Sequence, residues 1–418
     1  MKLRNKLLLV FAVLMLVFST SVFGAGIIVD GKDVEMESYQ TDGKLLVTAE
    51  SFDKLGLKVQ ENENEIELSN RNVKFIFTLN KNEVKVNDIE VRLDAPIVKV
   101  EDKSYLPLRF VLETLNYEVK WNDEANKVEA VHQNTLGYPI EIKLGEEVYS
   151  IEEAPKSLVS MAPSITERIF DLGIQDKLVA RTDYCTYPEA TKEIESVGSM
   201  YTPDLERIVG LKPEVVICET HFKAEALEKL REAGIPIISK ASSQDFEGIY
   251  DYTLFIGRVF DKQFEARAMV AASKAKVSTV KYLISSNNII RPRTYYSTGS
   301  GDYGEYGGPE NSFIGKMIVL CGGDNIMKEQ WREGNAIDWA YTVEDIVKND
   351  PEVIFGGAYG AGAMKTNELF KEVSAIQNDK VYVDDQEMFA KATHRLLDDG
   401  IKELLSLLQP TLAEQLSF

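Results

Sequence analysis

The sequence predicts an α/β protein, in which two α/β lobes are bridged by one long helix with a cleft between them and are preceded by a small α+β domain. From Lys156 onward, apolar runs of four to six residues alternate with amphipathic helical patterns, as in parallel α/β layers. A helical stretch without Gly or Pro, residues 262–286, separates these runs into two sets. Before Lys156, short runs alternate polar and apolar residues, which favours half-buried strands.

Residues 1–25 are predicted to form a signal peptide. "MKLRNK" is a basic start, "LLLVFAVLMLVF" is an apolar core, and "SVFGAG" offers small residues for cleavage after Gly24 or Ala25. The apolar core is shorter than the roughly 20 residues that a transmembrane helix needs. We therefore expect an exported protein at the extracellular face of the membrane or the cell surface, with an uncleaved anchor as the alternative. No cysteine lies near the cleavage point, so lipid attachment there is not expected.

Composition excludes several partners and sites. The net charge is -20, from 47 basic and 67 acidic side chains, and such a surface repels nucleic acid. Cys185, Cys218 and Cys321 are odd in number and widely spaced, so we expect buried free thiols rather than disulfides. Three histidines in the whole chain have no metal-site spacing. We expect no resident metal and no cofactor.

Residues 27–131 form the predicted α+β domain. "LLVTAESFDKLGLKV" (45–59) is echoed 60 positions later by "YLPLRFVLETLNYEV" (105–119), and each copy predicts a short amphipathic helix followed by a strand. "YLPLRFVLETLNYEVKWNDEANKVEAV" closely resembles the copper amine oxidase N-terminal-like domain, a small module of bacterial surface proteins. The resemblance implies a spacer or adhesion module that contacts the cell wall or surface, without oxidase chemistry.

The remaining chain is divided by its pattern into a linker and two lobes. Residues 132–155 are predicted as a linker with a lead-in strand, and residues 156–243 as the N-lobe, with strands at "SLVSMA", "KLVART", "EVVICE" and "PIISK". Residues 244–290 contain the bridging helix, nearly 40 Å long at about 1.5 Å per residue. Residues 291–418 form the C-lobe, with strands at "RTYYST", "EVIFGG" and "KVYVDD". Open α/β sheets bind ligands where their strands end, which places a cleft between the lobes.

"STGSGDYGEYGGPENSF", residues 297–313, contains the spacing G-x-G-x-x-G, which raises the question of a dinucleotide site. That fingerprint requires a helix to open inside the glycines, whereas the next helical pattern begins at about Glu310. Asp302 and Glu305 would also repel a pyrophosphate. We expect instead a cleft-lining loop, together with "GGAYGAGA" (356–363); plain flexible turns are the alternative.

Six motifs in order over about residues 150–410 resemble the helical-hinge class of ABC-importer solute-binding proteins, the carriers of vitamin B12, ferric siderophores and haem. They are "APSITERIFDLG", "TDYCTYPEATKEIESVG", "TPDLERIVGLKPEVVI", "FIGKMIVLCGGDNI", "YTVEDIVKNDPEVIF" and "NDKVYVDD". The resemblance implies a non-enzymatic protein that captures a metal chelate and delivers it to an ABC importer permease. Glu206 and Glu344 match the carboxylates that dock onto the permease. Both also lie early in helices, where a carboxylate favours the positive helix end.

Candidate cleft residues come from the loops at strand ends. They are Tyr184, Met200, Tyr201, His221 and Phe222 in the N-lobe, and Tyr303, Tyr306, Trp339, Tyr359, Phe389, His394 and Arg395 in the C-lobe. Aromatic side chains there suit a large planar ligand, although each alone fits ordinary packing equally well.

The cargo class is left open by these residues. "TDYCTYP", Trp339 and "MFAKATHR" favour a corrinoid by resemblance. For haem, Met200 or Tyr201 with His394 would supply axial ligands, whereas Arg395 and Arg181 would face an anionic ferric siderophore. A hydrolase would need G-x-S-x-G, which is absent, and a metal-cluster enzyme would need converging cysteines. A surface adhesion or structural protein is the alternative from another class.

Overall fold

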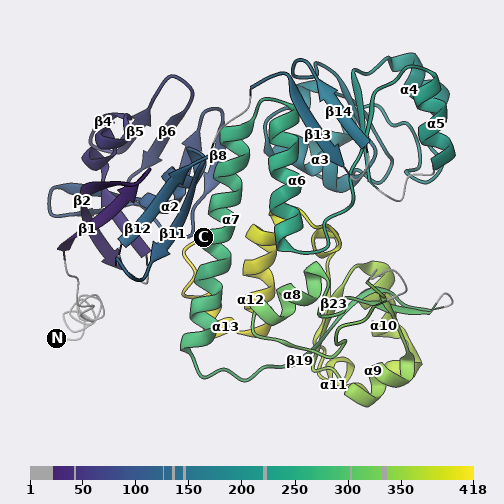
Figure 1. Ribbon diagram of the computed structural model, residues 1–418. Helices are drawn as coiled ribbons and strands as arrows, with labels where there is room; N and C mark the ends of the chain where they lie inside the picture. The colour runs from purple at the N-terminus through teal and green to yellow at the C-terminus, as the bar shows by residue number, and fades with distance from the viewer. Residues whose placement is uncertain are drawn as a thin grey trace. The chain divides into compact units, whose positions relative to one another are not determined.

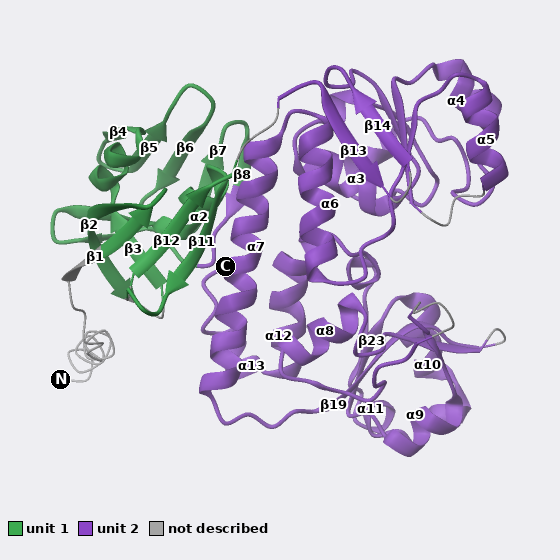
Figure 2. Cartoon of the chain, viewed as in Figure 1, with its two compact units in different colours: residues 1–90, 95–135 green, residues 91–94, 136–418 purple. Residues whose placement is uncertain are grey.

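The computed structural model describes residues 22–41, 44–125, 127–133, 137–144, 147–219, 224–301, 304–331 and 337–418. The chain forms two compact units, residues 1–90 with 95–135 and residues 91–94 with 136–418 (Figure 2). Most of the predicted signal peptide lies outside the described residues, which begin at Val22. Within the described ranges, none of the helices has both the length and the apolar character needed to span a bilayer.

The first unit is built mainly of β-strands. One sheet has the order β11-β12-β1-β2-β3-β10-β9, and β4 to β8 form a second, five-stranded sheet in sequence order. The strands are β1 (Val22–Val29), β2 (Lys32–Thr41), β3 (Lys44–Thr48), β4 (Lys58–Glu61), β5 (Glu65–Ser69), β6 (Lys74–Thr78), β7 (Glu83–Val86), β8 (Ile89–Arg92), β9 (Val98–Val100), β10 (Lys103–Pro107), β11 (Tyr117–Asn122) and β12 (Lys127–His132). The last two residues of β8 are assigned to the second unit.

The sequence echo in this unit corresponds to two equivalent helix–strand turns. The 3₁₀ helix η2 (Ala49–Leu55) precedes β4, and the α-helix α2 (Leu108–Thr114) precedes β11. Strand alternation buries Phe75 and Phe77, and Phe110 of α2 packs edge-on against both rings at 6.3 Å. The echo therefore marks the helical turns whose apolar residues close the core.

The N-lobe of the second unit contains a parallel sheet of order β16-β15-β17-β18, as the apolar runs predict. Its elements are β15 (Leu158–Ser160), α3 (Pro163–Asp171), η3 (Gln175–Lys177), β16 (Leu178–Arg181), η4 (Glu189–Glu193), α4 (Leu205–Leu211), β17 (Val215–Cys218), α5 (Ala224–Glu232) and β18 (Ile237–Ser239). The stretch expected to be a linker with one lead-in strand contains two paired strands, β13 (Ile140–Leu144) and β14 (Glu147–Ile151). Ile140 and Ile142 are buried in the N-lobe core, so this hairpin is part of the second unit.

The C-lobe sheet has the order β22-β20-β19-β23-β24, with β21 also paired to β19. β19, β23 and β24 are parallel, and β20 and β22 are antiparallel. The elements are β19 (Arg293–Gly299), β20 (Glu305–Gly307), α8 (Phe313–Leu320), β21 (Asp324–Asn325), β22 (Ala340–Tyr341), α9 (Val343–Asn349), β23 (Val353–Gly356), η6 (Ala358–Gly362), α10 (Ala363–Thr366), η7 (Glu368–Phe370), α11 (Ser374–Gln377), β24 (Val381–Val383), η8 (Met388–Ala390), η9 (Leu396–Gly400), α12 (Ile401–Leu408) and α13 (Pro410–Ala413).

One local expectation in the C-lobe was wrong. "GGAYGAGA" is not a loop throughout, because η6 is a π-helical turn that continues into α10. Runs of this length have too few turns for periodicity to decide between a helix and a turn.

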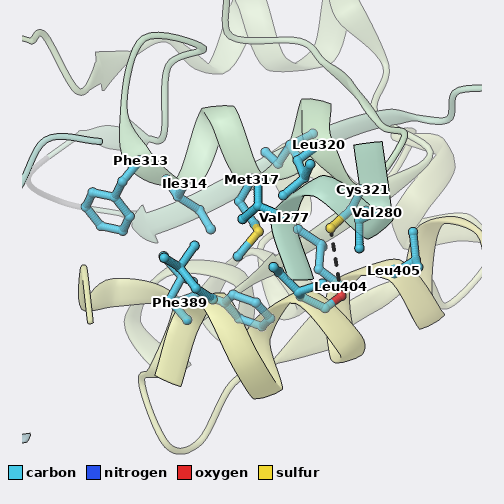
Figure 3. Packing of buried hydrophobic residues seen from close by; sticks show 14 of the residues in the cluster. Val277, Val280, Phe313, Ile314, Met317, Leu320, Cys321, Phe389, Leu404 and Leu405 are labelled. Atoms are coloured by element: carbon cyan, nitrogen blue, oxygen red, sulfur yellow. Dashed lines mark hydrogen bonds between the residues drawn. The ribbon is translucent and has the colours of Figure 1, made fainter. Parts of the chain in front are cut away.

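Two helices join the lobes, α6 (Phe246–Val259) and the 24-residue α7 (Gln263–Ser286) (Figure 1). At about 1.5 Å per residue, α7 is about 36 Å long. Ala266, near its start, belongs to the N-lobe core, whereas Val277 and Val280 belong to the C-lobe core. Figure 3 shows these valines beside Met317 of α8 and Cys321, the residue that follows this helix. Because one helix is packed into both cores, it limits how far the lobes can pivot.

Candidate functional site

The candidate ligand site lies where parallel strands of both lobes end. In the N-lobe, β16 leads into residues 182–187; in the C-lobe, β24 leads into residues 384–388. These two segments approach each other, because Tyr187 and residues 383–386 line one cavity. Ligands of open α/β sheets bind at this edge, which makes this cavity the candidate binding site.

Exposed tyrosines also lie beyond β16 in the N-lobe and beyond β19 and β23 in the C-lobe. Tyr184 and Tyr201 are 47% and 54% exposed, and their ring centroids lie 6.0 Å apart in an edge-to-face arrangement. In the C-lobe, Tyr306 is 37% exposed and Tyr359 is 83% exposed. Trp339 is half-buried against Phe313. Large amphipathic rings left at a surface can stack on a planar ligand.

Glu305 holds the first residues of the glycine-rich segment after β19. The Glu305 carboxylate accepts hydrogen bonds from Ser300 Oγ at 3.0 Å and from the Gly301 N–H at 3.3 Å. The Ser300 N–H donates to the Tyr359 carbonyl at 2.9 Å, which ties these residues to η6. The backbone φ angles of Gly301 and Gly304 are 127° and 98°. Residues other than glycine rarely adopt such positive values. No helix begins among the described glycines, in agreement with the rejection of a dinucleotide site.

A buried arginine connects the lobes beneath these loops. Arg168 on α3 donates from Nη1 to the Ser164 carbonyl at 2.8 Å and from Nη2 to the Ala392 carbonyl at 2.5 Å. Nη2 also lies 3.4 Å from Ser243 Oγ, and the guanidinium sits 4.6 Å from the centre of the Tyr252 ring. Since Ala392 belongs to the C-lobe, Arg168 holds segment 391–395 against α3.

Glu167, next to Arg168 on α3, places a negative charge near two buried cations of segment 391–395. Its Oε2 accepts a hydrogen bond from Thr393 Oγ1 at 2.8 Å. Its Oε1 lies 3.4 Å from Lys391 Nζ and 4.0 Å from Arg395 Nη1. Burial, and then the Glu167 carboxylate, raise the pKa of neighbouring Asp171 to about 7. The lobes therefore meet through a buried polar network rather than a purely apolar contact.

His394, the candidate axial ligand, lies within this network. It is only 6% exposed, and its Nδ1 is 2.7 Å from Ser273 Oγ of α7. Burial, followed by the charges of Arg168 and Lys276, lowers its pKa to about 3, so the ring is neutral at physiological pH. A planar macrocycle cannot reach His394 in this arrangement.

A cavity of about 310 Å³ opens beside the network. Its lining residues are Tyr187, Val383, Asp384, Asp385, Gln386, Met388, Arg395, Asp399 and Glu403. Arg395 is 9% exposed, and its guanidinium stacks 3.7 Å from the centre of the Tyr187 ring. The cavity thus combines residues from both lobes.

The predicted site residues fall into three groups. Tyr184, Tyr201, Tyr306 and Tyr359 are exposed and Met200 and Trp339 are half-buried, whereas His394, Arg395 and Phe389 are buried. Phe389 is 1% exposed and packs on Phe355 at 5.1 Å. Phe389 is therefore a core residue in this structure. His221, Phe222 and Tyr303 lie outside the described residues. Tyr187, Asp385 and Glu403 line the cavity but were not among the predicted site residues, although Tyr187 lies in "TDYCTYPEATKEIESVG" and Asp385 in "NDKVYVDD".

Glu206 and Glu344 occupy equivalent places in the two lobes. Each is exposed in the first turn of a seven-residue helix, α4 or α9. Asp204 caps α4 and Thr342 caps α9 through a side-chain oxygen. Both helices end in a left-handed residue before a buried strand. The fold thus presents one carboxylate per lobe on matching elements.

The described residues contain no cluster of three or more His, Cys, Asp and Glu side chains able to hold a metal ion. Cys185, Cys218 and Cys321 are buried free thiols, as expected. Burial raises the pKa of the Cys218 thiol to about 11, which makes it unreactive.

Comparison with known families identifies the chain. Residues 158–388 match the family described as periplasmic binding protein, and residues 28–130 match the copper amine oxidase N-terminal domain. The chain belongs to the periplasmic binding protein family, with the α/β fold and preceding β-rich domain described above. It is a non-enzymatic solute-binding protein of the ABC-transporter type, in the class that includes binders of vitamin B12, haem and siderophores.

Two relatives illustrate the similarity in sequence. An uncharacterized ABC transporter substrate-binding lipoprotein of Bacillus subtilis is 25% identical over 69% of this chain and 91% of its own length. A cobalamin-binding protein of Halobacterium salinarum is 27% identical over 56% of this chain, but the match spans only 62% of that protein.

Solved structures show the same fold. A periplasmic heme binding protein from Pseudomonas aeruginosa superimposes with a TM-score of 0.55 at 19% identity, covering 62% of this chain and 94% of that one. An ABC-type Fe³⁺-hydroxamate transport protein from Saccharomonospora viridis gives 0.54 at 18% identity, covering 65% and 99%. At such identities the likeness concerns the fold alone.

Proposed function

We propose that this protein captures a corrinoid between its lobes outside the cytoplasmic membrane and delivers it to an ABC importer. The observation that carries the proposal is the set of accessible tyrosines at the strand ends, combined with the burial of His394. The rings provide stacking surface for a large planar chelate, and the cleft histidine that the structure describes, His394, is buried. The similarity to a cobalamin-binding protein supports the same cargo.

The test is a titration of the purified protein with cyanocobalamin and, separately, with hemin, followed by visible absorbance and tryptophan fluorescence. We expect saturable cyanocobalamin binding with a micromolar or tighter Kd, which is about -8 kcal/mol or better. Weak or absent cyanocobalamin binding would contradict the proposal.

Haem is the second candidate because Met200 and Tyr201 lie at the surface of the same N-lobe loop. Tight hemin binding with a shifted Soret band, lost on Met200→Ala or Tyr201→Phe, would favour haem over a corrinoid. A ferric siderophore is a weaker candidate, because Arg181 donates instead to the carbonyls of Thr191 and Thr182.

Glu206 and Glu344 are proposed to dock onto basic residues of the permease. Exposed ion pairs contribute only about 0–1 kcal/mol each, so they orient the complex without slowing its release. The double variant Glu206→Arg/Glu344→Arg should abolish uptake in a reconstituted importer and leave the cargo Kd unchanged. A matched control, Glu225→Arg/Glu368→Arg, changes exposed helical carboxylates elsewhere and should transport normally. Normal uptake by the first variant would disprove the docking role.

The first unit is proposed to act as a spacer or adhesion module at the cell surface. The Bacillus relative is described as a lipoprotein, whereas no cysteine precedes Cys185 in this chain. Cell fractionation of the native protein and of a deletion of residues 27–131 should show surface retention that depends on the module. Equal retention of both forms would contradict this role.

A further inference from the structure

Glu305 in β20 has a buried carboxylate whose hydrogen-bond partners among the described residues are neutral. The residue is 4% exposed, and its Oε1 accepts from Ser300 Oγ and from the Gly301 N–H. Burial raises the pKa of Glu305, and these two hydrogen bonds oppose the shift. Burying a carboxylate without a cation is costly, and an apolar side chain of similar size would avoid that cost. The residue is therefore better explained by what its hydrogen bonds hold than by its packing.

These hydrogen bonds hold the end of β19, from which a further bond leads to Tyr359. Gly299 is the last residue of β19, and Ser300 and Gly301 follow it directly. The Ser300 N–H donates to the Tyr359 carbonyl at 2.9 Å, and the Tyr359 ring is exposed. Glu305 is thus connected to the backbone of one candidate cleft residue through a single intermediate residue.

The ring of Tyr306, the residue after Glu305, lies against the same glycine-rich segment. A Cβ placed on Gly299 would lie 3.9 Å from Tyr306 Cδ2, and one placed on Gly304 would lie 3.8 Å from Tyr306 Cε2. Thr298 Oγ1 also donates to the Tyr306 carbonyl at 3.2 Å. Successive side chains of a strand point to opposite faces, and β20 accordingly alternates buried Glu305 with exposed Tyr306. Glu305 therefore holds the segment from the buried face while the Tyr306 ring covers it on the exposed face.

Strand β20 also holds a third candidate cleft residue, Trp339. The Gly307 N–H donates to the Trp339 carbonyl at 2.8 Å, and Tyr306 pairs with Ala340 of β22. Three aromatic residues that were predicted to face the cargo are thus attached to β20 or to the segment that Glu305 holds.

We propose that Glu305 is a positioning residue for cargo binding: its carboxylate fixes residues 299–301, so that the rings of Tyr306 and Tyr359 are arranged before the cargo arrives. This inference rests on the proposed function, which assigns these rings to the cargo. Glu305 is buried and acts through the segment rather than by touching the cargo. Rings that are already ordered reduce the entropy that binding must overcome.

Two substitutions separate the hydrogen bonds of Glu305 from its packing. In Glu305→Gln, the amide oxygen can still accept from the segment, and the NH₂ group can donate to the Tyr295 hydroxyl oxygen. That hydroxyl is buried without a hydrogen-bond partner among the described residues, and burial followed by the Glu305 carboxylate raises its pKa. Glu305→Met keeps the length of the side chain but has no strong acceptor. The matched control is Glu265→Met, because Glu265 is also 4% exposed but lies on α7, paired with Lys262 at 3.2 Å.

The first measurement is amide hydrogen exchange of Ser300 and Gly301 by NMR, on the full chain without cargo. In Glu305→Met both amides should exchange at least about tenfold faster, because Gly301 loses its acceptor and Ser300 loses its alignment with the Tyr359 carbonyl. Glu305→Gln and Glu265→Met should stay within about threefold of the native rates.

The second measurement is the cyanocobalamin Kd by isothermal titration calorimetry. Glu305→Met should bind about tenfold more weakly, a difference of about 1.4 kcal/mol, whereas Glu305→Gln and Glu265→Met should stay within about threefold of the native Kd. A general loss of stability would affect Glu305→Met and Glu265→Met alike. Should Glu305→Met fail to fold, Ser300→Ala removes one of the two hydrogen bonds at a half-buried residue and should weaken binding about threefold.

Each outcome decides a different statement. Native exchange rates in Glu305→Met, or in Ser300→Ala at Gly301, together with a native Kd refute the positioning role while corrinoid binding stands. Faster exchange with an unchanged Kd refutes the connection between the segment and the cargo. Equal losses in Glu305→Met and Glu305→Gln refute the assignment to hydrogen bonds. If the native protein does not bind cyanocobalamin, the proposed function fails, and amide exchange, which needs no cargo, still confirms or refutes the hold of Glu305 on residues 299–301.

Discussion

Replacement of Arg168 by alanine should be among the most destabilising single changes at the lobe interface. The side chain is fully buried, donates to carbonyls in both lobes, and lies over the Tyr252 ring. Hydrogen bonds from charged groups contribute about 1.5–3 kcal/mol each, and part of that gain is offset by desolvation of the guanidinium. Removing one partner of such a buried network costs about 3–5 kcal/mol. We therefore expect Arg168→Ala to lower the free energy of unfolding by about 4 kcal/mol.

The matched control is Arg207→Ala. Both arginines lie on helices, and Ala and Arg have similar helix propensities, so that contribution cancels. Arg207 is 51% exposed at its side chain and pairs with a partly exposed Glu195, which contributes at most about 1 kcal/mol. Urea unfolding followed by circular dichroism measures the difference.

Hydrogen exchange identifies where the loss occurs. In Arg168→Ala, protection should fall in α3 and in residues 391–395, because these segments are joined by the lost hydrogen bonds. Arg168→Lys should be intermediate, since one ammonium cannot reproduce the planar fork of donors. If Arg168→Ala unfolds within 1 kcal/mol of Arg207→Ala, the buried network does not join the lobes as argued.

Three further predictions concern the same unit. Gly360→Ala should lower the free energy of unfolding by about 1–3 kcal/mol, because the new Cβ would lie 2.0 Å from the Ser297 carbonyl oxygen. In the control Gly357→Ala, the new Cβ meets no atom within 4 Å, so this change should be nearly neutral. Equal melting temperatures of the two variants would contradict this prediction. The pKa of Asp171 is raised to about 7 by burial, above the value of about 3.9 expected for the unfolded chain, so its ionisation opposes folding as pH rises between these values. Asp171→Asn should therefore gain stability relative to the native protein from pH 4 to 7, and a constant difference in urea midpoint would disprove the assignment. His394→Ala should reduce stability but leave the Soret band of any hemin complex unchanged, whereas a shifted band would show that the histidine reaches the iron.

The spacing of apolar residues was enough to predict the two lobes, their central strands and the long helix between them. The apolar runs at β17 and β23 are buried along their whole length, as expected for central parallel strands. The predicted helix 262–286 agrees with α7, because a long stretch without Gly or Pro leaves little choice of local structure. Failures were confined to short segments such as 356–363, where turns and helices share the same composition.

By itself, the sequence determined the order of strands and helices, the lobes and the positions of the exposed tyrosines, because these depend on neighbours within one or two turns. Only the tertiary structure decided that His394 and Phe389 are buried and that Arg395 lines a cavity. His394 meets Ser273 across 121 positions, and Thr393 meets Glu167 across 226. Contacts at such separations form only when α7 brings the lobes together. The local spacing of apolar residues in the sequence therefore cannot predict them.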